Sequence, residues 1–162
     1  MKIAIVYTSK TGNTKMLAET IKDSLPQDTC VYCGAPDVKA AQADLIFAGF
    51  WTDKGSCDAD FASFLENLHH QKLFLFGTAG FGEDATYFSR ILANVKTHLD
   101  ASNDVIDSNM CQGKMPGFVR QRYEAEQKTD MIANFDKALS HPDEKDLANL
   151  AQKAKETLIK VK

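Results

Sequence analysis

The chain has 162 residues, of which 44% are hydrophobic and 25% charged, with a formal net charge of −3 at pH 7. This length suits one domain that buries roughly two-thirds of its unfolded surface, so neither a disulfide nor a structural metal is needed. The mild charge, without a basic stripe, argues against nucleic-acid binding. No apolar run approaches the roughly 20 residues that span a bilayer, and no secretory pattern is present, so we expect a cytoplasmic protein with no membrane partner.

The first predicted strand, residues 3–7, is apolar almost throughout, as in a strand covered on both faces of a parallel sheet. It leads into the stretch 8–14, TSKTGNT, and then into a helix predicted over 15–25. A helix start carries amides without acceptors and roughly half a positive charge, so this turn suits a phosphate group. A capped helix start without a ligand is the alternative.

Further strands are predicted at residues 29–33, 44–50 and 72–77, and from 105 towards 111. Amphipathic helices are predicted between them. This alternation indicates a parallel sheet with helices on both faces, joined by right-handed crossovers. The loops after the first, third and fourth strands then emerge at one edge of the sheet, where ligands bind in open α/β folds.

The segment 114–140 is predicted to elaborate the single domain, 1–162, between the fifth strand and a closing amphipathic helix. It contains a helical stripe of Met131, Ile132, Phe135 and Leu139. Three roles stay open for this segment: shielding a ligand, recognising a partner, or covering a sheet edge.

Aromatic and glycine residues follow the third and fourth strands. Trp51 is placed at a strand exit before a polar stretch, which favours stacking on a planar ligand over packing against a helix. Phe81 or Tyr87 is expected at the other face of that ligand. Gly80 and Gly82 would let main-chain amides approach it, with ordinary loop geometry as the alternative.

The TSKTGNT stretch after an N-terminal strand resembles the phosphate loop of the flavodoxin family. The resemblance covers the chain to about residue 113 and again the final helix. It implies a flavodoxin-like three-layer α/β/α sandwich, with a five-stranded parallel sheet in the order 2-1-3-4-5, and FMN as cofactor. The cofactor site expected from these loops and this resemblance comprises Thr8, Ser9, Lys10, Thr11, Gly12, Asn13, Thr14, Phe50, Trp51, Thr52, Gly55, Thr78, Ala79, Gly80, Phe81 and Gly82.

The resemblance also implies a role for Gly55, whose peptide would turn its carbonyl towards the flavin N5 hydrogen that one-electron reduction creates. We expect Gly55→Ala to decrease the semiquinone population. Acidic residues near the expected ring edge would lower the hydroquinone potential and steer basic partners, or form an ordinary solvated rim. They are Asp53, Asp58, Asp60, Glu83 and Asp84, against Lys54.

We therefore expect an FMN-binding carrier that moves low-potential single electrons between redox partner proteins, a reductase and an electron acceptor, and has no catalytic residues. The alternative is an NAD(P)H- or quinone-linked FMN reductase on the same fold. A third possibility is a flavin-free module that binds an anion. The four cysteines and four histidines show no metal-site spacing, so we expect reduced thiols and no metal.

Overall fold

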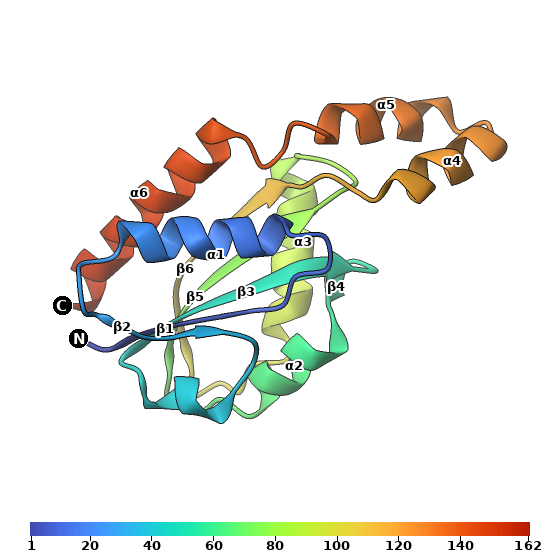
Figure 1. Cartoon of the computed structure of the whole chain (residues 1–162). Coiled ribbons are helices and arrows are strands. Elements are labelled where there is room, and N and C mark those ends of the chain that lie inside the picture. Colours follow the sequence, from blue (N-terminus) through green and yellow to red (C-terminus); the bar gives the residue numbers. More distant parts are fainter.

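The computed structural model describes every residue, Met1–Lys162, as a three-layer α/β/α sandwich (Figure 1). Its long strands are all parallel to their neighbours and follow the order β2-β1-β3-β5-β6. Their bounds are β1 Ile3–Tyr7, β2 Cys30–Gly34, β3 Leu45–Asp53, β5 Lys72–Ala79 and β6 Asp104–Gln112. The predicted order 2-1-3-4-5 of the five parallel strands is thereby confirmed.

One short strand was not predicted. β4, Ser56–Cys57, pairs antiparallel with the end of β3 through Thr52 and Asp53. β3 runs three residues beyond the predicted end at Phe50, because Trp51 pairs with Thr78 of β5, and Thr52 and Asp53 pair with β4. The third strand therefore reaches past the sheet into the region where ligands were expected.

The helices cover both faces of the sheet. In Figure 1, α1 and α6 lie on one face and α2 and α3 on the other. The helices are α1 Asn13–Ser24, α2 Ala59–Glu66, α3 Ala85–Lys96, α4 Gly117–Ala125, α5 Thr129–Ala138 and α6 Glu144–Val161, and a 3-10 helix, η1, spans Val38–Gln42. None of these helices has the length and apolar character that a membrane span requires.

Two apolar cores follow from the alternation of side chains along the buried strands. In β1, Ile3 and Ile5 join the core beneath α1 and α6, whereas Ala4 and Val6 join the core beneath α2 and α3. Phenylalanines are the largest fully buried side chains of both cores, and Phe47 and Phe74 in the first core lie 5.1 Å apart between ring centroids. The sheet is thus packed against helices on both faces, and the loops lie at its carboxyl edge.

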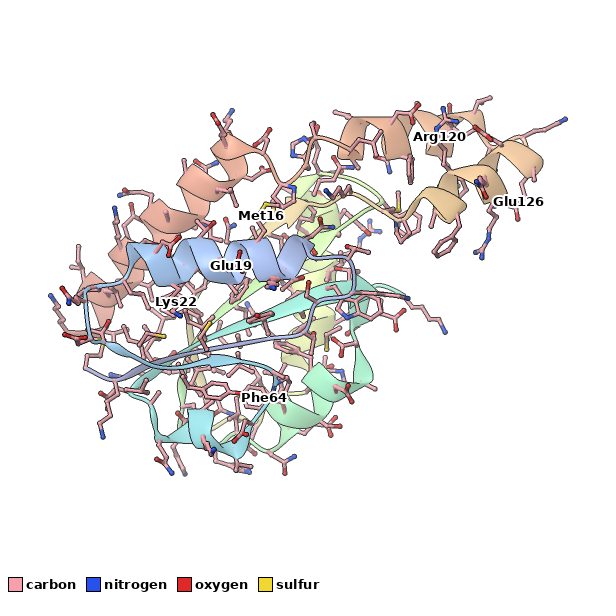
Figure 2. The ribbon with its side chains drawn as sticks, viewed as in Figure 1. Met16, Glu19, Lys22, Phe64, Arg120 and Glu126 are labelled. Atoms are coloured by element: carbon pink, nitrogen blue, oxygen red, sulfur yellow. The ribbon has the colours of Figure 1, made fainter.

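The segment 114–140 forms a pair of helices, α4 and α5, that projects beyond the sheet (Figure 1). We call residues 117–138 the arm. The side chains of Tyr123, Phe135 and Ala138 are buried in it, and Arg120 joins the two helices through Nε and Nη2 to both carboxylate oxygens of Asp136, at 2.8 and 3.0 Å. Figure 2 shows Arg120 between the two helices and Glu126 near the far end of the arm. Leu139 was expected in the buried stripe but is 53% exposed.

Candidate cofactor-binding site

A cleft of about 380 Å³ opens at the carboxyl edge of the sheet. Its walls come from the turn after β1, the end of β3, the loop after β5, and the segment that joins β6 to α4 together with α4 itself. The three loops predicted to converge do so. The fourth wall was not predicted, although the sequence left open that residues 114–140 shield a ligand.

The predicted site residues fall into three groups. Those that line the cleft are Lys10, Thr11, Asn13, Trp51, Thr52, Thr78, Ala79, Gly80 and Phe81. A more open hollow beside the cleft shares Lys10 and Trp51 with it and is also lined by Thr8 and Ser9. The residues that line neither are Gly12, Thr14, Phe50, Gly55 and Gly82.

The turn after β1 presents unused hydrogen-bond donors. The main-chain N–H groups of residues 9–14 donate to no acceptor in the protein, whereas the N–H of Lys15 is bound to Ser9 Oγ at 3.2 Å. Gly12 stands at the N-cap of α1 with φ 93°, a left-handed conformation that favours glycine, and provides no side-chain cap. A run of free amides at a helix N-terminus fits a phosphate group.

Thr14 and Phe50 have structural roles. The hydroxyl of Thr14 is buried, donates to the Phe50 carbonyl at 3.2 Å and lies 3.3 Å from Thr78 Oγ1. The Phe50 ring is buried against Phe61, with 5.5 Å between centroids. These contacts fix the first turn of α1 to β3 and β5, so the free amides are held in place relative to the cleft.

The aromatic residues differ in their access to the cleft. Trp51 lines both hollows, and Lys10 Nζ lies 5.0 Å from the centroid of its ring, a cation–π contact. Phe81 is 57% exposed and lines the cleft. Tyr87 instead packs on the core beside Phe88, and burial raises the pKa of its hydroxyl. Of the two aromatic residues left open by the sequence, Phe81 is the one at the cleft.

Gly55 lies in the tight turn between β3 and β4. Its φ is 79° and that of Lys54 is 50°, so both residues are left-handed, as in type I′ hairpin turns. Its carbonyl oxygen accepts a hydrogen bond from Asn94 Nδ2 of α3 at 2.8 Å. In this structure the carbonyl is therefore directed to α3, and its expected role towards the cofactor stays a prediction.

The segment between β6 and α4 is tied directly to the first turn of α1. Asn13 Nδ2 donates to the Lys114 carbonyl at 2.8 Å, across 101 residues of sequence. Gly113 permits this approach, because a Cβ there would lie 2.5 Å from Asn13 Nδ2. A contact between residues so distant leaves no local pattern, which explains why the sequence did not reveal this wall of the cleft.

Two buried polar atoms of cleft-lining residues have no partner in the protein: Asn13 Oδ1 and Thr52 Oγ1. Buried polar atoms are nearly always hydrogen-bonded in folded proteins. These two atoms, together with the free amides of the first turn, fit a ligand that carries both a phosphate and a polar ring system, as FMN does.

The charge of the cleft differs from that of the hollow beside it. The cleft lining contains four basic side chains and a single acidic one, Asp53, whereas Asp58 and Asp60, two other residues of the expected acidic edge, line the open hollow that shares Trp51 with the cleft. The basic residues are Lys10, Lys54, Lys114 and Arg122. Two of these cations come from the wall formed by α4 and the segment before it, which the sequence did not place beside the loops.

Most of the predicted acidic residues have structural partners. Asp58 caps α2 and accepts from Thr8 Oγ1 at 2.5 Å, and Asp84 caps α3. Glu83 pairs with Lys137 Nζ at 2.5 Å, and this hydrogen bond lowers the pKa of Glu83. These carboxylates stabilise helix starts and the base of the arm.

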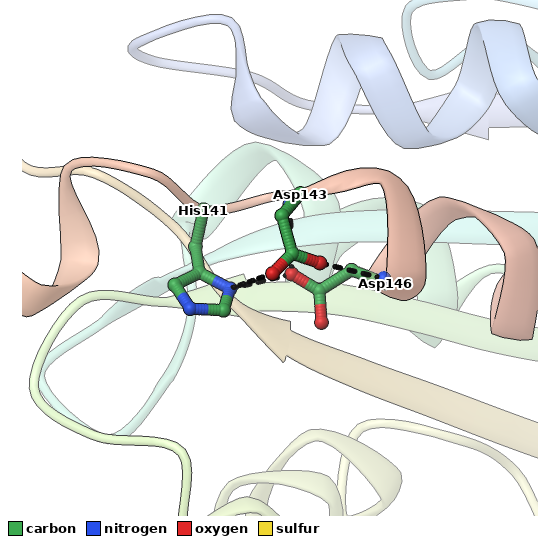
Figure 3. A group of neighbouring side chains, drawn as sticks. All are labelled: His141, Asp143 and Asp146. Carbon is green, nitrogen blue, oxygen red and sulfur yellow. Dashed lines mark hydrogen bonds and ion pairs between the residues drawn. The ribbon is translucent and has the colours of Figure 1, made fainter.

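A second charged cluster consists of His141, Asp143 and Asp146 (Figure 3). Asp143 and Asp146 form the capping box of α6, each accepting the main-chain N–H of the other at 2.9 Å. His141 Nδ1 lies 2.6 Å from Asp146 Oδ2, and the His141 carbonyl accepts the N–H of Lys114 at 3.0 Å. This cluster is a helix cap that supports the fourth wall of the cleft from outside.

Comparison with known proteins identifies relatives over almost the whole chain. A family model described as "Flavodoxin domain" matches residues 4–155. The flavodoxin-like domain-containing protein BilS of Clostridium symbiosum is 38% identical, over 91% of this chain and 91% of that protein.

Solved structures show the same fold at lower identity. A short-chain flavodoxin associated with a non-canonical PDU bacterial microcompartment aligns over 100% of both chains, with a TM-score of 0.61 and 16% identity. A flavoprotein from Lactobacillus acidophilus NCFM, solved in complex with FMN, aligns with a TM-score of 0.53 and 16% identity, over 68% of this chain and 93% of that one.

Proposed function

Because the chain belongs to the flavodoxin-domain family, we propose that it binds FMN in the cleft and carries single electrons between partner proteins in the cytoplasm. The family supports FMN as the cofactor and a redox function. When bound, FMN supplies reversible one- and two-electron chemistry. The chain's own residues bind and orient it and control its surroundings.

The observation that carries this proposal is the set of unused amides in residues 9–14, next to the cleft in which Trp51 and Phe81 stand. The amides would hold the phosphate, and the two aromatic side chains would flank the ring. Asn13 Oδ1 and Thr52 Oγ1, which have no hydrogen-bond partner in the protein, would bond to polar atoms of the cofactor. The four cleft cations favour the negative charge that reduction adds, so we propose a less negative potential than an acidic edge would give.

Stepwise anaerobic reduction of the FMN-loaded protein, followed by visible absorption, tests the carrier function. Accumulation of a long-wavelength band at half reduction supports single-electron transfer. Direct conversion to the two-electron-reduced form contradicts it. Failure to retain FMN contradicts the site itself.

A matched pair of variants tests the position of the phosphate. Thr11→Asp places a negative charge in the turn and is expected to weaken FMN binding at least about tenfold by repulsion. Thr129→Asp, at the start of α5, makes the same chemical change away from the cleft and is expected to leave FMN affinity unchanged. Fluorescence titration of FMN measures both, and equal affinities for Thr11→Asp and the unsubstituted protein would place the phosphate elsewhere.

One observation favours the alternative, an FMN reductase. The side of the cleft formed by α4 and the segment before it includes Met115, Pro116 and Val119, an apolar wall of the kind against which a planar substrate would pack. The FMN-loaded protein is therefore assayed alone for oxidation of NADH or NADPH with a quinone as acceptor. Turnover without a partner protein supports the reductase, and its absence supports the carrier.

A further inference from the structure

The mouth of the cleft combines exposed aromatic rings with positive charge. Phe81 and Phe118 line the cleft, and each is 57% exposed. Lys54, Lys114 and Arg122 belong to the same lining and are also exposed. We call these five side chains the rim. They come from the turn between β3 and β4, the loop after β5, the segment after β6, and α4, so only the folded chain gathers them.

The rim has the opposite sign to the protein as a whole, whose formal net charge is −3. None of its three cations forms an ion pair within the protein. The fourth cleft cation, Lys10, belongs to the turn with the free amides, where a phosphate would offset its charge. The rim cations face solvent without such a partner.

Basic side chains outnumber acidic ones in the cleft lining, whereas Asp58 and Asp60 line the open hollow beside it. Asp53 is the single acidic residue of the cleft lining. Glu83, two residues after Phe81 in the loop after β5, is paired with Lys137, and Asp84 caps α3. Unpaired cations next to solvent-exposed aromatic rings make a surface that is both attractive to acidic groups and able to bury apolar area.

We propose that the rim is the docking surface for a redox partner protein whose contact face is acidic and carries an apolar patch. The proposal rests on the proposed function of electron carrier. Arginine and aromatic residues are the side chains enriched at the centres of protein interfaces. Complementary charge accelerates encounter and orients the partner. A protein docked on the rim lies directly over the mouth of the cleft, where an electron must leave.

The arm extends this surface. α4 contributes Phe118 and Arg122, and the arm projects beyond the sheet where it can contact a docked protein (Figures 1 and 2). A small anionic substrate would not need exposed rings on the outer edge of the cleft. The exposed rings therefore favour a protein over a small molecule as the occupant of the rim. The test below distinguishes these two occupants.

The test follows electron transfer from the reduced, FMN-loaded protein to an acidic haem protein, cytochrome b5, at increasing ionic strength. If the rim governs docking, the rate with cytochrome b5 is highest at low salt and falls as salt rises, although both proteins carry net negative charge. Salt screens such attraction because the Debye length shortens from about 30 Å at 0.01 M to about 8 Å at 0.15 M. A rate with cytochrome b5 that rises with salt would overturn the proposal, because net charge would then govern.

Charge-reversal variants localise the effect. Arg122→Glu and Lys54→Glu are each expected to lower the low-salt rate with cytochrome b5 by about tenfold and to flatten its salt dependence. Lys155→Glu, on the exposed surface of α6, makes the same charge change away from the rim. A loss as large in Lys155→Glu as in the rim variants would overturn the proposal.

The aromatic part of the rim has its own variants. Phe118→Ala is expected to slow transfer to cytochrome b5 at every salt concentration, because apolar contact is not screened. The matched control is Ile159→Ala on α6, where Ile159 is 73% exposed. Equal rates for Phe118→Ala and the unsubstituted protein would remove the aromatic contact from the proposal.

Two readouts separate failure of this proposal from failure of the proposed function. FMN titration shows whether each variant is loaded, and reoxidation by neutral benzoquinone shows whether the bound cofactor reacts normally. Loss of either in the unsubstituted protein contradicts the electron-carrier function. A different result would overturn the docking surface in favour of a small anionic substrate. In that case FMN binding and reoxidation by benzoquinone are normal, and the rim variants impair oxidation of NADPH but not the reaction with cytochrome b5.

Discussion

Asn134 Nδ2, on α5, donates a hydrogen bond to the carbonyl oxygen of Gly80 at 3.2 Å. The same oxygen accepts Gln112 Nε2 at 3.2 Å, and Gln112 Nε2 also lies 3.2 Å from Asn134 Oδ1. The arm and the end of β6 thus hold one peptide of the cleft wall. Because a trans peptide is planar, with its N–H opposite its carbonyl, fixing the Gly80 oxygen also fixes the direction of the Phe81 N–H.

Asn134→Ala is expected to weaken FMN binding about two- to tenfold, since one amide–carbonyl hydrogen bond contributes about 0.5–1.5 kcal/mol. Fluorescence titration of FMN measures the change. Asn67→Ala is the control, because Asn67 Nδ2 also donates to a carbonyl, that of Ser63, at 2.7 Å, but at the end of α2. An FMN affinity equally reduced in both variants would contradict a specific role for Asn134.

Gly113→Ala and Gly117→Ala are expected to have opposite effects. A Cβ on Gly113 would lie 2.5 Å from Asn13 Nδ2, so the bond from Asn13 to Lys114 must yield and the fourth wall of the cleft moves. A Cβ on Gly117, the first residue of α4, meets no atom within 4 Å. We expect Gly113→Ala to destabilise the protein by about 1–3 kcal/mol and Gly117→Ala to be neutral or to stabilise it by up to about 1 kcal/mol. Urea unfolding measures both, and destabilisation by the two variants alike would contradict the structure of this segment.

Two substitutions in the turn between β3 and β4 are also expected to change the free energy of unfolding in opposite directions. Gly55→Ala forces a Cβ into a left-handed residue and is expected to cost about 1 kcal/mol, whereas Lys54→Gly relieves the same conformation and is expected to stabilise by less than about 1 kcal/mol. Thermal unfolding of the two variants provides the measurement. Stabilisation by Gly55→Ala would show that this turn adopts another conformation in solution.

Asp143 provides a pH-dependent prediction. Its carboxylate accepts the main-chain N–H of Asp146, and this hydrogen bond lowers the pKa of Asp143 below its ordinary value of 3.8. A lowered native pKa contributes stability that is present above pH 3.8 and is lost as the pH falls through the native value. The unfolding free energy is therefore expected to decrease from about pH 4 downwards.

Asp143→Asn separates this titration from other acid effects. The amide can still cap α6 but does not titrate in this range, so the decrease below about pH 4 is expected to be shallower. Asp23→Asn, on the surface of α1, makes the same charge change without removing a cap. Urea midpoints between about pH 5 and 2 measure the three proteins, and parallel curves would show that Asp143 does not contribute.

Local patterns in the sequence predicted much of the fold. Each central strand is a nearly continuous apolar run, because it is buried on both faces, and each predicted parallel strand is present. The end of β3 was missed, since Thr52 and Asp53 are polar and extend the strand through pairing with β4. The exposed position of Leu139 was also missed, because α5 ends at Ala138 before that residue could join the stripe.

The sequence by itself determined the parallel sheet and the turn of free amides after β1, because each depends on residues close together in the chain. Trp51 was expected at a strand exit but lies inside β3, since it pairs with Thr78 of β5 and the strand continues to Asp53. Only the tertiary structure decided the charge and the fourth wall of the cleft. Asn13 meets Lys114 across 101 residues, and that contact brings Lys114 and Arg122 to loops whose own residues suggested an acidic edge. The tertiary structure also decided the direction of the Thr14 side chain. Its hydroxyl is adjacent to the free amides in the sequence, but it is buried against the sheet and donates to the Phe50 carbonyl there.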